Sequence, residues 1–287
     1  MPSEAQQPDP DRPASSAGRR SGAPWRTPPT PRIPGYEIGE VVGRGSMGIV
    51  YRARQLIVDR EVAIKVLHPE HREKDRLIRR LQREARTTAR LAHPHVVSAI
   101  DMGETDGLWW YAMEYVDGPS LAGRLRQEGR LKERTALRLF IPLVEALEHL
   151  NEHGVVHRDI KPANILIDKA GGARLADLGL AFVEQDPSIT GQGGTLGTPH
   201  YISPEQAVDS SSADVRSDIW SLGATLYHSV CGRPPFSGNS AAEILSALLY
   251  QRVPDPRELE PGLSKGLALV IRKCLTHEPE GRYQTPR

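Results

Sequence analysis

Short alternating runs of apolar and polar residues fill the first part of the chain, and helical spacing dominates the rest. Residues 36–68 contain β-branched stretches broken by Gly and Asp-Arg, which predicts three antiparallel strands. Residues 74–92 carry apolar side chains at a 3.6-residue period, which predicts a helix. Two more short strands are expected within residues 96–103 and 108–116.

After residue 118 the pattern becomes mainly helical, in LAGRLRQEG, ERTALRLFIPLVEALEHLNEHG, SDIWSLGATLYHSVCG and further segments. Pro142 falls inside the second of these, where the missing N–H predicts a kink. Strands grouped before helices indicate an α+β protein rather than alternating βαβ units. We therefore expect a small strand-rich lobe and a larger helical lobe, joined near residues 116–118.

Composition changes the picture mainly at the N-terminus. Residues 1–34 are rich in Pro, Ser, Gly and Arg and poor in apolar side chains, which predicts a disordered arm without a signal peptide. The 37 Lys and Arg nearly balance the 36 Asp and Glu, and the two cysteines lack ligand spacing. No apolar run approaches the roughly 20 residues that span a bilayer. We expect a cytoplasmic chain with no membrane span and no nucleic-acid partner.

A glycine-rich stretch lies between the first two expected strands. Gly43, Gly45 and Gly48 form G-x-G-x-x-G, and Val50 follows. Glycines let backbone amides approach phosphates closely. The dinucleotide-binding version of this pattern requires a helix directly afterwards, whereas IVYRAR continues as a strand. Taken alone, the motif leaves a phosphate-covering loop and an ordinary hairpin as equal alternatives.

Lys65 stands in the middle of the β-branched strand EVAIKVL. A single strand lysine more often faces solvent, because an unpaired buried ammonium is costly. Glu84, however, falls within the apolar face of the predicted helix over residues 74–92, and a carboxylate on that face needs a cation. Each of these two charges would be costly to bury alone, so we predict an ion pair between the Lys65 ammonium and the Glu84 carboxylate.

A sharper group of polar residues follows in HRDIKPAN and ADLG. Asp159 is a candidate proton acceptor, and Lys161 is a cation two residues later. Asn164 and Asp177 carry the oxygen ligands that Mg²⁺ prefers, with substrate phosphates completing its shell. Each residue alone is typical of a loop or a cap. Their order, behind a glycine-rich loop and a strand lysine, makes chance agreement improbable.

With these motifs the sequence resembles the eukaryotic-type protein kinase family, specifically its bacterial serine/threonine branch. GRGSMGIV resembles the phosphate-covering loop, VAIK the strand lysine motif, HRDIKPAN the catalytic loop and DLG the metal-binding motif. GTPHYISPEQ resembles the end of the activation segment. In SDIWSLG, Asp218 matches the family residue that braces the catalytic loop, and Arg282 matches the partner of Glu205.

The resemblance implies a bilobal kinase fold. Residues 35–287 would form the kinase domain, with an antiparallel N-lobe and its helix C over about 35–116. The mainly helical C-lobe would span about 117–287, and we expect the family's final helix to be missing from it. A longer form could be membrane-anchored.

The resemblance also implies roles for residues. Asp159 would accept the proton of the substrate hydroxyl, and Lys161 would balance charge on the transferred group. Thr198 would contact the side chains of Asp159 and Lys161. Lys65 would hold the ATP phosphates, oriented by Glu84. Mg²⁺, or Mn²⁺ as an alternative, would bind Asn164 and Asp177. The implied cofactor-binding residues are Val42, Gly43, Gly45, Ser46, Gly48, Val50, Ala63, Lys65, Met113, Glu114, Val116, Asn164, Leu166 and Asp177.

Lys161 within DIKPAN resembles the serine/threonine branch, which implies protein substrates phosphorylated on Ser or Thr. Arg158 beside Asp159 is typical of kinases regulated through the activation segment. A phosphate on a hydroxyl of that segment would pair with the Arg158 guanidinium. Activation in trans through a transient homodimer would suit the family. The candidate phosphorylation sites are Ser188, Thr190 and Thr195.

Leu178 occupies the position at which the better-known motif has Phe. In the family this side chain packs in an apolar column, here with Thr88 and His157, so we expect altered packing and retained chemistry. Two alternatives to an active protein kinase make different predictions. A nucleotide-binding pseudokinase scaffold predicts the loss of a catalytic residue, and a small-molecule kinase predicts the lack of the long activation segment and SDIWSLG.

Overall fold

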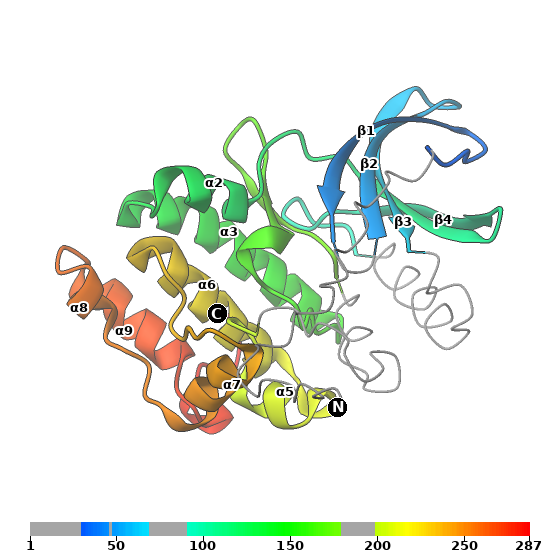
Figure 1. The fold of residues 1–287 in the computed structure, drawn as a ribbon. Helices are drawn as coiled ribbons and strands as arrows, with labels where there is room; N and C mark the ends of the chain where they lie inside the picture. Colours follow the sequence, from blue (N-terminus) through cyan, green and yellow to red (C-terminus); the bar gives the residue numbers. More distant parts are fainter. Residues whose placement is uncertain (1–29, 46–47, 69–90, 179–198) are drawn as a thin grey trace, which may run out of the picture. The chain divides into compact units, whose positions relative to one another are not determined.

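The computed structural model describes residues 30–45, 48–68, 91–178 and 199–287 (Figure 1). Residues 32–287 form one compact unit, and the elements below belong to it. The predicted helix over residues 74–92 falls almost entirely outside the described residues. Residues 91 and 92, which are described, are not helical.

A five-stranded antiparallel sheet forms the first part of this unit, in the order β1-β2-β3-β5-β4 (Figure 1). The three strands and the two later strands expected from the sequence are thereby confirmed. The turn between β2 and β3 is placed by the Asp-Arg signal, and Asp59 there has a φ of 49°. The strands are β1 Tyr36–Arg44, β2 Gly48–Gln55, β3 Arg60–Leu67, β4 Ala99–Thr105 and β5 Leu108–Glu114.

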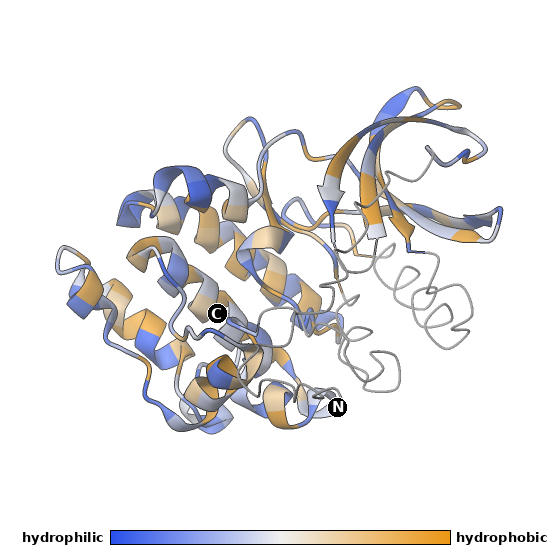
Figure 2. Ribbon diagram, viewed as in Figure 1, coloured by the Kyte–Doolittle hydropathy of each residue, from blue (hydrophilic) through white to orange (hydrophobic). Residues whose placement is uncertain are grey.

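The central strand β3 is buried on both faces, and apolar residues run along it and β2 (Figure 2). Because side chains alternate across a strand, Val62, Ile64 and Val66 lie on one face and enter the main cluster of the sheet, which also contains Ile33 and Trp110. The opposite face of β3 carries Ala63 and Lys65. A lysine in this position is therefore placed inside the protein by the strand period itself.

Helices form the second part of the unit. Helix α6 is its centre: most of its residues are buried, and it contacts α3, α8 and α9. A Cβ at Gly223 would lie 2.5 Å from the Cβ of Cys274, so glycine allows α9 to approach closely. The helices are α2 Leu121–Glu128, α3 Glu133–Glu152, α5 Pro204–Val208, α6 Val215–Cys231, α7 Ala241–Tyr250, α8 Pro256–Leu259 and α9 Lys265–Cys274.

Helix α3 continues through Pro142 over all of its 20 residues. Its buried side chains, including Leu139, Leu143 and Leu150, recur at helical spacing and form the stripe that packs inward. This packing holds the helix together where proline removes a hydrogen bond. The kink expected at Pro142 stays a prediction.

A short hairpin, β6 Ile165–Ile167 and β7 Ala173–Leu175, connects the two parts of the unit. Leu175 forms a parallel bridge with Val96. The Leu175 N–H donates to the His95 carbonyl at 2.8 Å, and the Val97 N–H donates to the Leu175 carbonyl at 2.8 Å. The hairpin is therefore hydrogen-bonded to the segment that leads into the sheet.

Among the described residues, no helix combines the length and the apolarity that crossing a membrane requires. The predicted domain boundaries stay predictions. Ile33, near the end of the expected arm, is 5% exposed and packs in the cluster of the sheet.

Candidate active site

The catalytic-loop motif lies between α3 and β6 and is hydrogen-bonded to Asp218 of α6. The two carboxylate oxygens of Asp218 accept hydrogen bonds from the backbone N–H groups of His157 and Arg158, each at 2.7 Å. Arg158 has a φ of 67°, in the left-handed region. Burial raises the pKa of Asp218 to about 7, although the two backbone donors act to lower it. The bracing role expected of Asp218 is confirmed by this geometry.

Asp159 lies at the centre of a small polar group. Its Oδ2 is 2.8 Å from the Lys161 ammonium and accepts a 2.7 Å hydrogen bond from the Asn164 amide nitrogen. The same amide nitrogen donates to the Asp159 carbonyl at 2.8 Å. The short helical turn Pro162–Asn164 thus returns Asn164 onto Asp159. Three of the predicted site residues meet here.

Asp177 is brought to this group by the β6–β7 hairpin. The Ala176 N–H donates to the Asn164 carbonyl at 2.9 Å, and Asp177 follows with a φ of 59°. Lys65 reaches Asp177 from β3, with 3.1 Å between its Nζ and Oδ2. Lys65 is only 7% exposed, so the alternative of a solvent-facing lysine is wrong. Among the described residues, Asp177 is the partner of Lys65. Glu84 lies outside the described residues, so its predicted pair with Lys65 stays a prediction.

Asn164 and Asp177 together offer hard oxygen donors. The side-chain amide of Asn164 directs its nitrogen to Asp159. This orientation leaves the side-chain oxygen of Asn164 as a candidate ligand for a cation. The described residues contain no group of three or more His, Cys, Asp or Glu arranged to hold a metal. A pair of protein oxygens completed by ligand phosphates is instead the arrangement typical of Mg²⁺. These residues therefore fit Mg²⁺ bound together with a phosphate ligand.

An apolar cluster beside the polar group joins five of the residues predicted to bind the cofactor. They come from β2, β3, β5, the following linker and β6, and they are Val50, Ala63, Met113, Val116 and Leu166. Direct pairing of β3 with β5 places Ala63 opposite Met113. Val42 is 45% exposed and lies outside this cluster. The cluster forms the apolar wall that a planar ring would require.

Sequence reasoning missed three members of this cluster, Val97, Tyr111 and Ala176, while a fourth, Tyr115, lies within the predicted segment Glu114 to Val116. Tyr111 had a usable signal, since it is two residues before Met113 on the same face of β5 and lies opposite Lys65. Burial and the nearby Asp177 charge raise the pKa of the Tyr111 phenol. Its ring therefore lies close to both the apolar wall and the polar group.

The three glycines of the glycine-rich stretch make different backbone contacts where β1 and β2 meet. A Cβ at Gly48 would lie 2.1 Å from the Val66 carbonyl oxygen, so strand approach alone demands glycine there. Gly43 pairs with Val50, and the Gly45 N–H donates to the Gly48 carbonyl at 2.9 Å. The turn is therefore closed by backbone contacts, whatever ligand it covers.

Several predicted residues lie outside the described part of the chain, namely Ser46, Glu84, Thr88, Ser188, Thr190, Thr195 and Thr198. Two members of the expected apolar column are described. Leu178 is 8% exposed and belongs to the helical core cluster, and His157 is fully buried. Burial lowers the pKa of the His157 imidazole to about 4, so it is neutral near pH 7. Leu178 is therefore a packing group, and the buried His157 ring also accepts a 3.3 Å hydrogen bond at Nδ1 from the Asp159 N–H.

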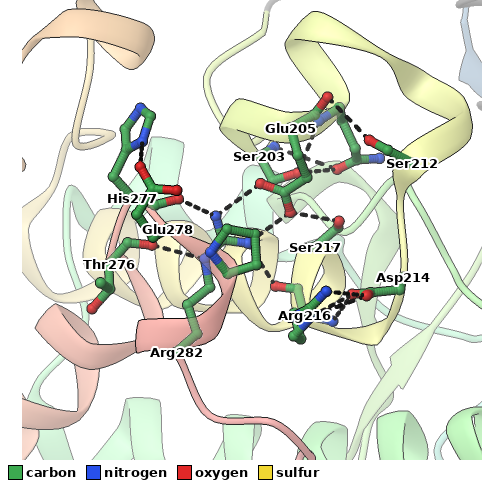
Figure 3. A network of polar contacts seen from close by, with 12 residues as sticks. Ser203, Glu205, Ser212, Asp214, Arg216, Ser217, Thr276, His277, Glu278 and Arg282 are labelled. Atoms are coloured by element: carbon green, nitrogen blue, oxygen red, sulfur yellow. Dashed lines mark hydrogen bonds and ion pairs between the residues drawn. The ribbon is translucent and has the colours of Figure 1, made fainter.

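A second polar network lies behind the site, where Arg282 meets Glu205 (Figure 3). The guanidinium donates to both carboxylate oxygens, at 2.7 and 2.8 Å, as expected from the sequence. Burial raises the pKa of Glu205, but hydrogen bonds from Arg282 and Ser217 and the Arg282 charge outweigh it and lower the pKa to about 2. Gln206, which sequence reasoning missed, donates to the Arg158 carbonyl at 3.3 Å. Helix α5 is thereby tied to the catalytic loop.

Comparison with known proteins places this geometry in a family. A family model described as the protein kinase domain matches residues 36–286. The chain is 39% identical to the serine/threonine-protein kinase PrkC of Bacillus subtilis, over 88% of this chain and 39% of that protein. It is 37% identical to the serine/threonine-protein kinase PknB of Mycobacterium tuberculosis, over 87% of this chain and 41% of that protein.

A third relative is the DNA damage-responsive serine/threonine-protein kinase RqkA of Deinococcus radiodurans, 40% identical over 90% of this chain and 39% of that protein. The chain thus spans about two fifths of the length of these relatives. Among solved structures, a mutant PknI kinase domain from Mycobacterium tuberculosis aligns with a TM-score of 0.73 at 28% identity, covering 90% of this chain and 94% of that one. The α+β bilobal fold expected from the sequence is confirmed, and the chain belongs to the protein kinase domain family.

Proposed function

We propose that this chain is an ATP-dependent serine/threonine protein kinase. The observation that carries the proposal is the joining of two charge groups, Lys65 with Asp177 and Asp159 with Lys161, through the hydrogen bond between Ala176 and Asn164. The names of the relatives support the same activity. The residues whose loss would favour a pseudokinase scaffold are all present, namely Lys65, Asp159, Asn164 and Asp177.

The apolar cluster would hold the adenine ring. Ala63 and Leu166 would contact its two faces, and Met113 would close the back of the pocket. The Lys65 ammonium, buried beside this wall, would bind the α- and β-phosphates, and Glu84 would orient it. The γ-phosphate would then lie toward Asp159.

Asp159 would accept the proton of the substrate hydroxyl. As that oxygen forms its bond to the γ-phosphorus, the bond from this phosphorus to the bridging oxygen breaks and ADP leaves. Lys161, 2.8 Å from the Asp159 carboxylate, would offset negative charge on the transferred group. Asn164 holds the Asp159 side chain in place by a 2.7 Å hydrogen bond. Catalysis of this kind depends on positioning and electrostatic stabilisation.

Asn164 and Asp177 would hold Mg²⁺, with Mn²⁺ as an alternative. When bound, the ion would neutralise phosphate charge and fix the orientation of the phosphates. Because Asp177 also contacts Lys65, the same carboxylate would position a protein cation and a metal ion against one triphosphate.

The finer parts of the proposal concern substrates and regulation. Ser or Thr hydroxyls of proteins would be the acceptors, including Ser188, Thr190 or Thr195 of the chain itself, modified in trans through a transient homodimer. Arg158 would receive the resulting phosphate, and its backbone is held by Asp218 and Gln206. We place the activity in the cytoplasm, on a chain that a longer form could anchor to a membrane.

Transfer from γ-labelled ATP with Mg²⁺, followed by mass mapping of the products, tests the proposal. Asp159→Asn should lower transfer by about 10²- to 10⁴-fold while ATP still binds, because it removes the proton acceptor. Asp209→Asn, an exposed carboxylate capping a short helical turn, is the matched control and should retain activity. Equal transfer by Asp159→Asn would overturn the role of Asp159. ATP binding without any transfer by the wild-type chain would overturn the proposed activity.

A further inference from the structure

Arg174 of β7 contacts two carboxylates from different parts of the fold. Its guanidinium forms an ion pair with Glu114 and lies 3.7 Å from Asp168. Its side chain is 26% exposed, and 60 residues separate it from Glu114. Arg174 has no place in the roles proposed above, so the contact calls for an explanation of its own.

Glu114 is fixed at its end of this contact. It is the last residue of β5, it faces Val62 in the sheet, and its N–H donates to the Ser98 carbonyl at 3.0 Å. Its neighbours Met113 and Val116 belong to the apolar cluster. The Glu114 carboxylate therefore projects from the same stretch of backbone that carries Met113 and Val116 at the edge of the proposed adenine pocket.

Arg174 is fixed at the other end. It lies opposite Leu166 in the β6–β7 hairpin, and Leu166 is a member of the apolar cluster. Asp168, which faces the guanidinium, accepts a 2.8 Å hydrogen bond from the Gly172 N–H in the turn of the same hairpin. The guanidinium is therefore oriented by a carboxylate that the turn itself holds.

We propose that Arg174 is a positioning residue for the nucleotide: its ion pair with Glu114 sets the separation between the sheet side and the hairpin side of the adenine pocket. The inference rests on the proposed ATP site and names one residue that controls its width. Since Ala63 lies on the sheet side and Leu166 on the hairpin side, loss of the pair would loosen contact with the ring and spare the phosphates.

The hairpin supplies a matched control. Lys169 forms an ion pair with Asp117 from the tip of the same β6–β7 turn, but its side chain is 78% exposed. Screening by water makes such a pair a poor spacer. A comparison of Arg174→Gln with Lys169→Gln therefore separates pocket width from a general loss of positive charge.

The experiment measures adenosine affinity by calorimetry and steady-state kinetics with ATP. Arg174→Gln and Glu114→Gln should each weaken adenosine binding and raise KM for ATP by about three- to tenfold, with kcat within about twofold. Inhibition by inorganic tripolyphosphate, which lacks the ring, should not change. Arg174→Lys should recover part of the affinity, and Lys169→Gln should match the wild type.

Unchanged adenosine affinity in folded Arg174→Gln, checked by thermal denaturation, would overturn the inference. So would an equal loss in Lys169→Gln, or a loss of tripolyphosphate inhibition as large as that of adenosine. If Arg174→Gln does not fold, Arg174→Lys and Glu114→Gln carry the same test. Adenosine binding by a wild-type chain that transfers no phosphate would contradict the proposed kinase activity alone, because the affinity comparison needs no turnover.

Discussion

Two buried cations in this protein are partnered in very different ways. Arg282 is 2% exposed and uses its five N–H donors on Glu205 and on the backbone carbonyls of Thr276, His277 and Arg216. Lys65 is 7% exposed and, among the described residues, its hydrogen bond goes to Asp177 alone. The first cation is saturated by protein acceptors, whereas within the described residues the second contacts a single carboxylate.

The difference separates structural charge from functional charge. Burial of a guanidinium is offset only when every donor has a partner, and Arg282 meets that condition at the junction of α5, α6 and the C-terminal segment. An ammonium that must bind phosphate cannot have all of its donors occupied by the protein. A buried cation whose donors are all taken by protein acceptors, such as Arg282, is therefore a structural charge.

The largest effect should come from Arg282→Met. It leaves the Glu205 carboxylate partly buried without its cation, so the free energy of unfolding should fall by about 3–5 kcal/mol. The melting temperature should then fall by about 6–20 °C in thermal denaturation. Arg272→Met on α9, where the arginine side chain is 59% exposed, is the control and should change stability little. If Arg282→Met is as stable as the wild type, Arg282 is not the structural charge that the comparison takes it to be.

Next in size is Lys65→Met. Phosphoryl transfer should fall by about 10²- to 10³-fold, because one preorganised charge on the phosphates is lost. Stability should change by less than about 1 kcal/mol, since the Asp177 side chain is 28% exposed and keeps contact with water. Activity and urea denaturation are measured on the same preparation. Destabilisation as large as that of Arg282→Met would show that Lys65 is also a structural charge.

The pH dependence of stability sharpens the structural half of the comparison. Glu205 has a folded pKa of about 2 against an ordinary value of 4.5, so its contribution is complete above pH 4.5 and is lost as the pH falls toward 2. Urea midpoints measured from pH 5 to 2.5 should therefore fall more steeply in the wild type than in Glu205→Gln. Parallel profiles for the two proteins would rule out Glu205 as the group responsible.

The smallest effect is expected from Leu178→Phe, which restores the more familiar residue beside Asp177. Leu178 is buried in the helical core cluster, so repacking around the larger ring should cost less than about 1.5 kcal/mol. Transfer should stay within a few-fold of the wild type in a steady-state assay. A loss as large as that of Lys65→Met would give residue 178 a share in the chemistry.

Elements with a strong period or a local misfit could be predicted from the sequence. The five strands followed from alternation and turn residues, and the burial of Lys65 followed from the need to pair it with Glu84 on the apolar face of a predicted helix. The Arg282–Glu205 pair and the Asp218 brace followed from the family resemblance. Each of these signals is visible within a short stretch of residues.

Contacts between ordinary-looking polar residues far apart in the chain could not be predicted. Arg174 and Glu114 are only partly buried and sit at positions that suit a surface residue, and Gln206 meets the Arg158 carbonyl across 48 residues. No periodicity encodes such pairs, because they depend on how segments distant in the sequence pack together. The expected Lys65–Glu84 pair and the role of Thr198 stay predictions, since both involve residues outside the described ranges.

The order of biosynthesis gives the Asp218 brace a further consequence. The carboxylate that holds the His157 amide lies 61 residues later in the chain. At about 5–20 residues per second, a ribosome needs about 3 to 12 s to add them. During that interval the catalytic loop of a nascent chain lacks its brace, and Glu205 waits longer still, because Arg282 is 77 residues beyond it. A growing chain on the ribosome therefore carries the residues of the proposed active site before it can position them.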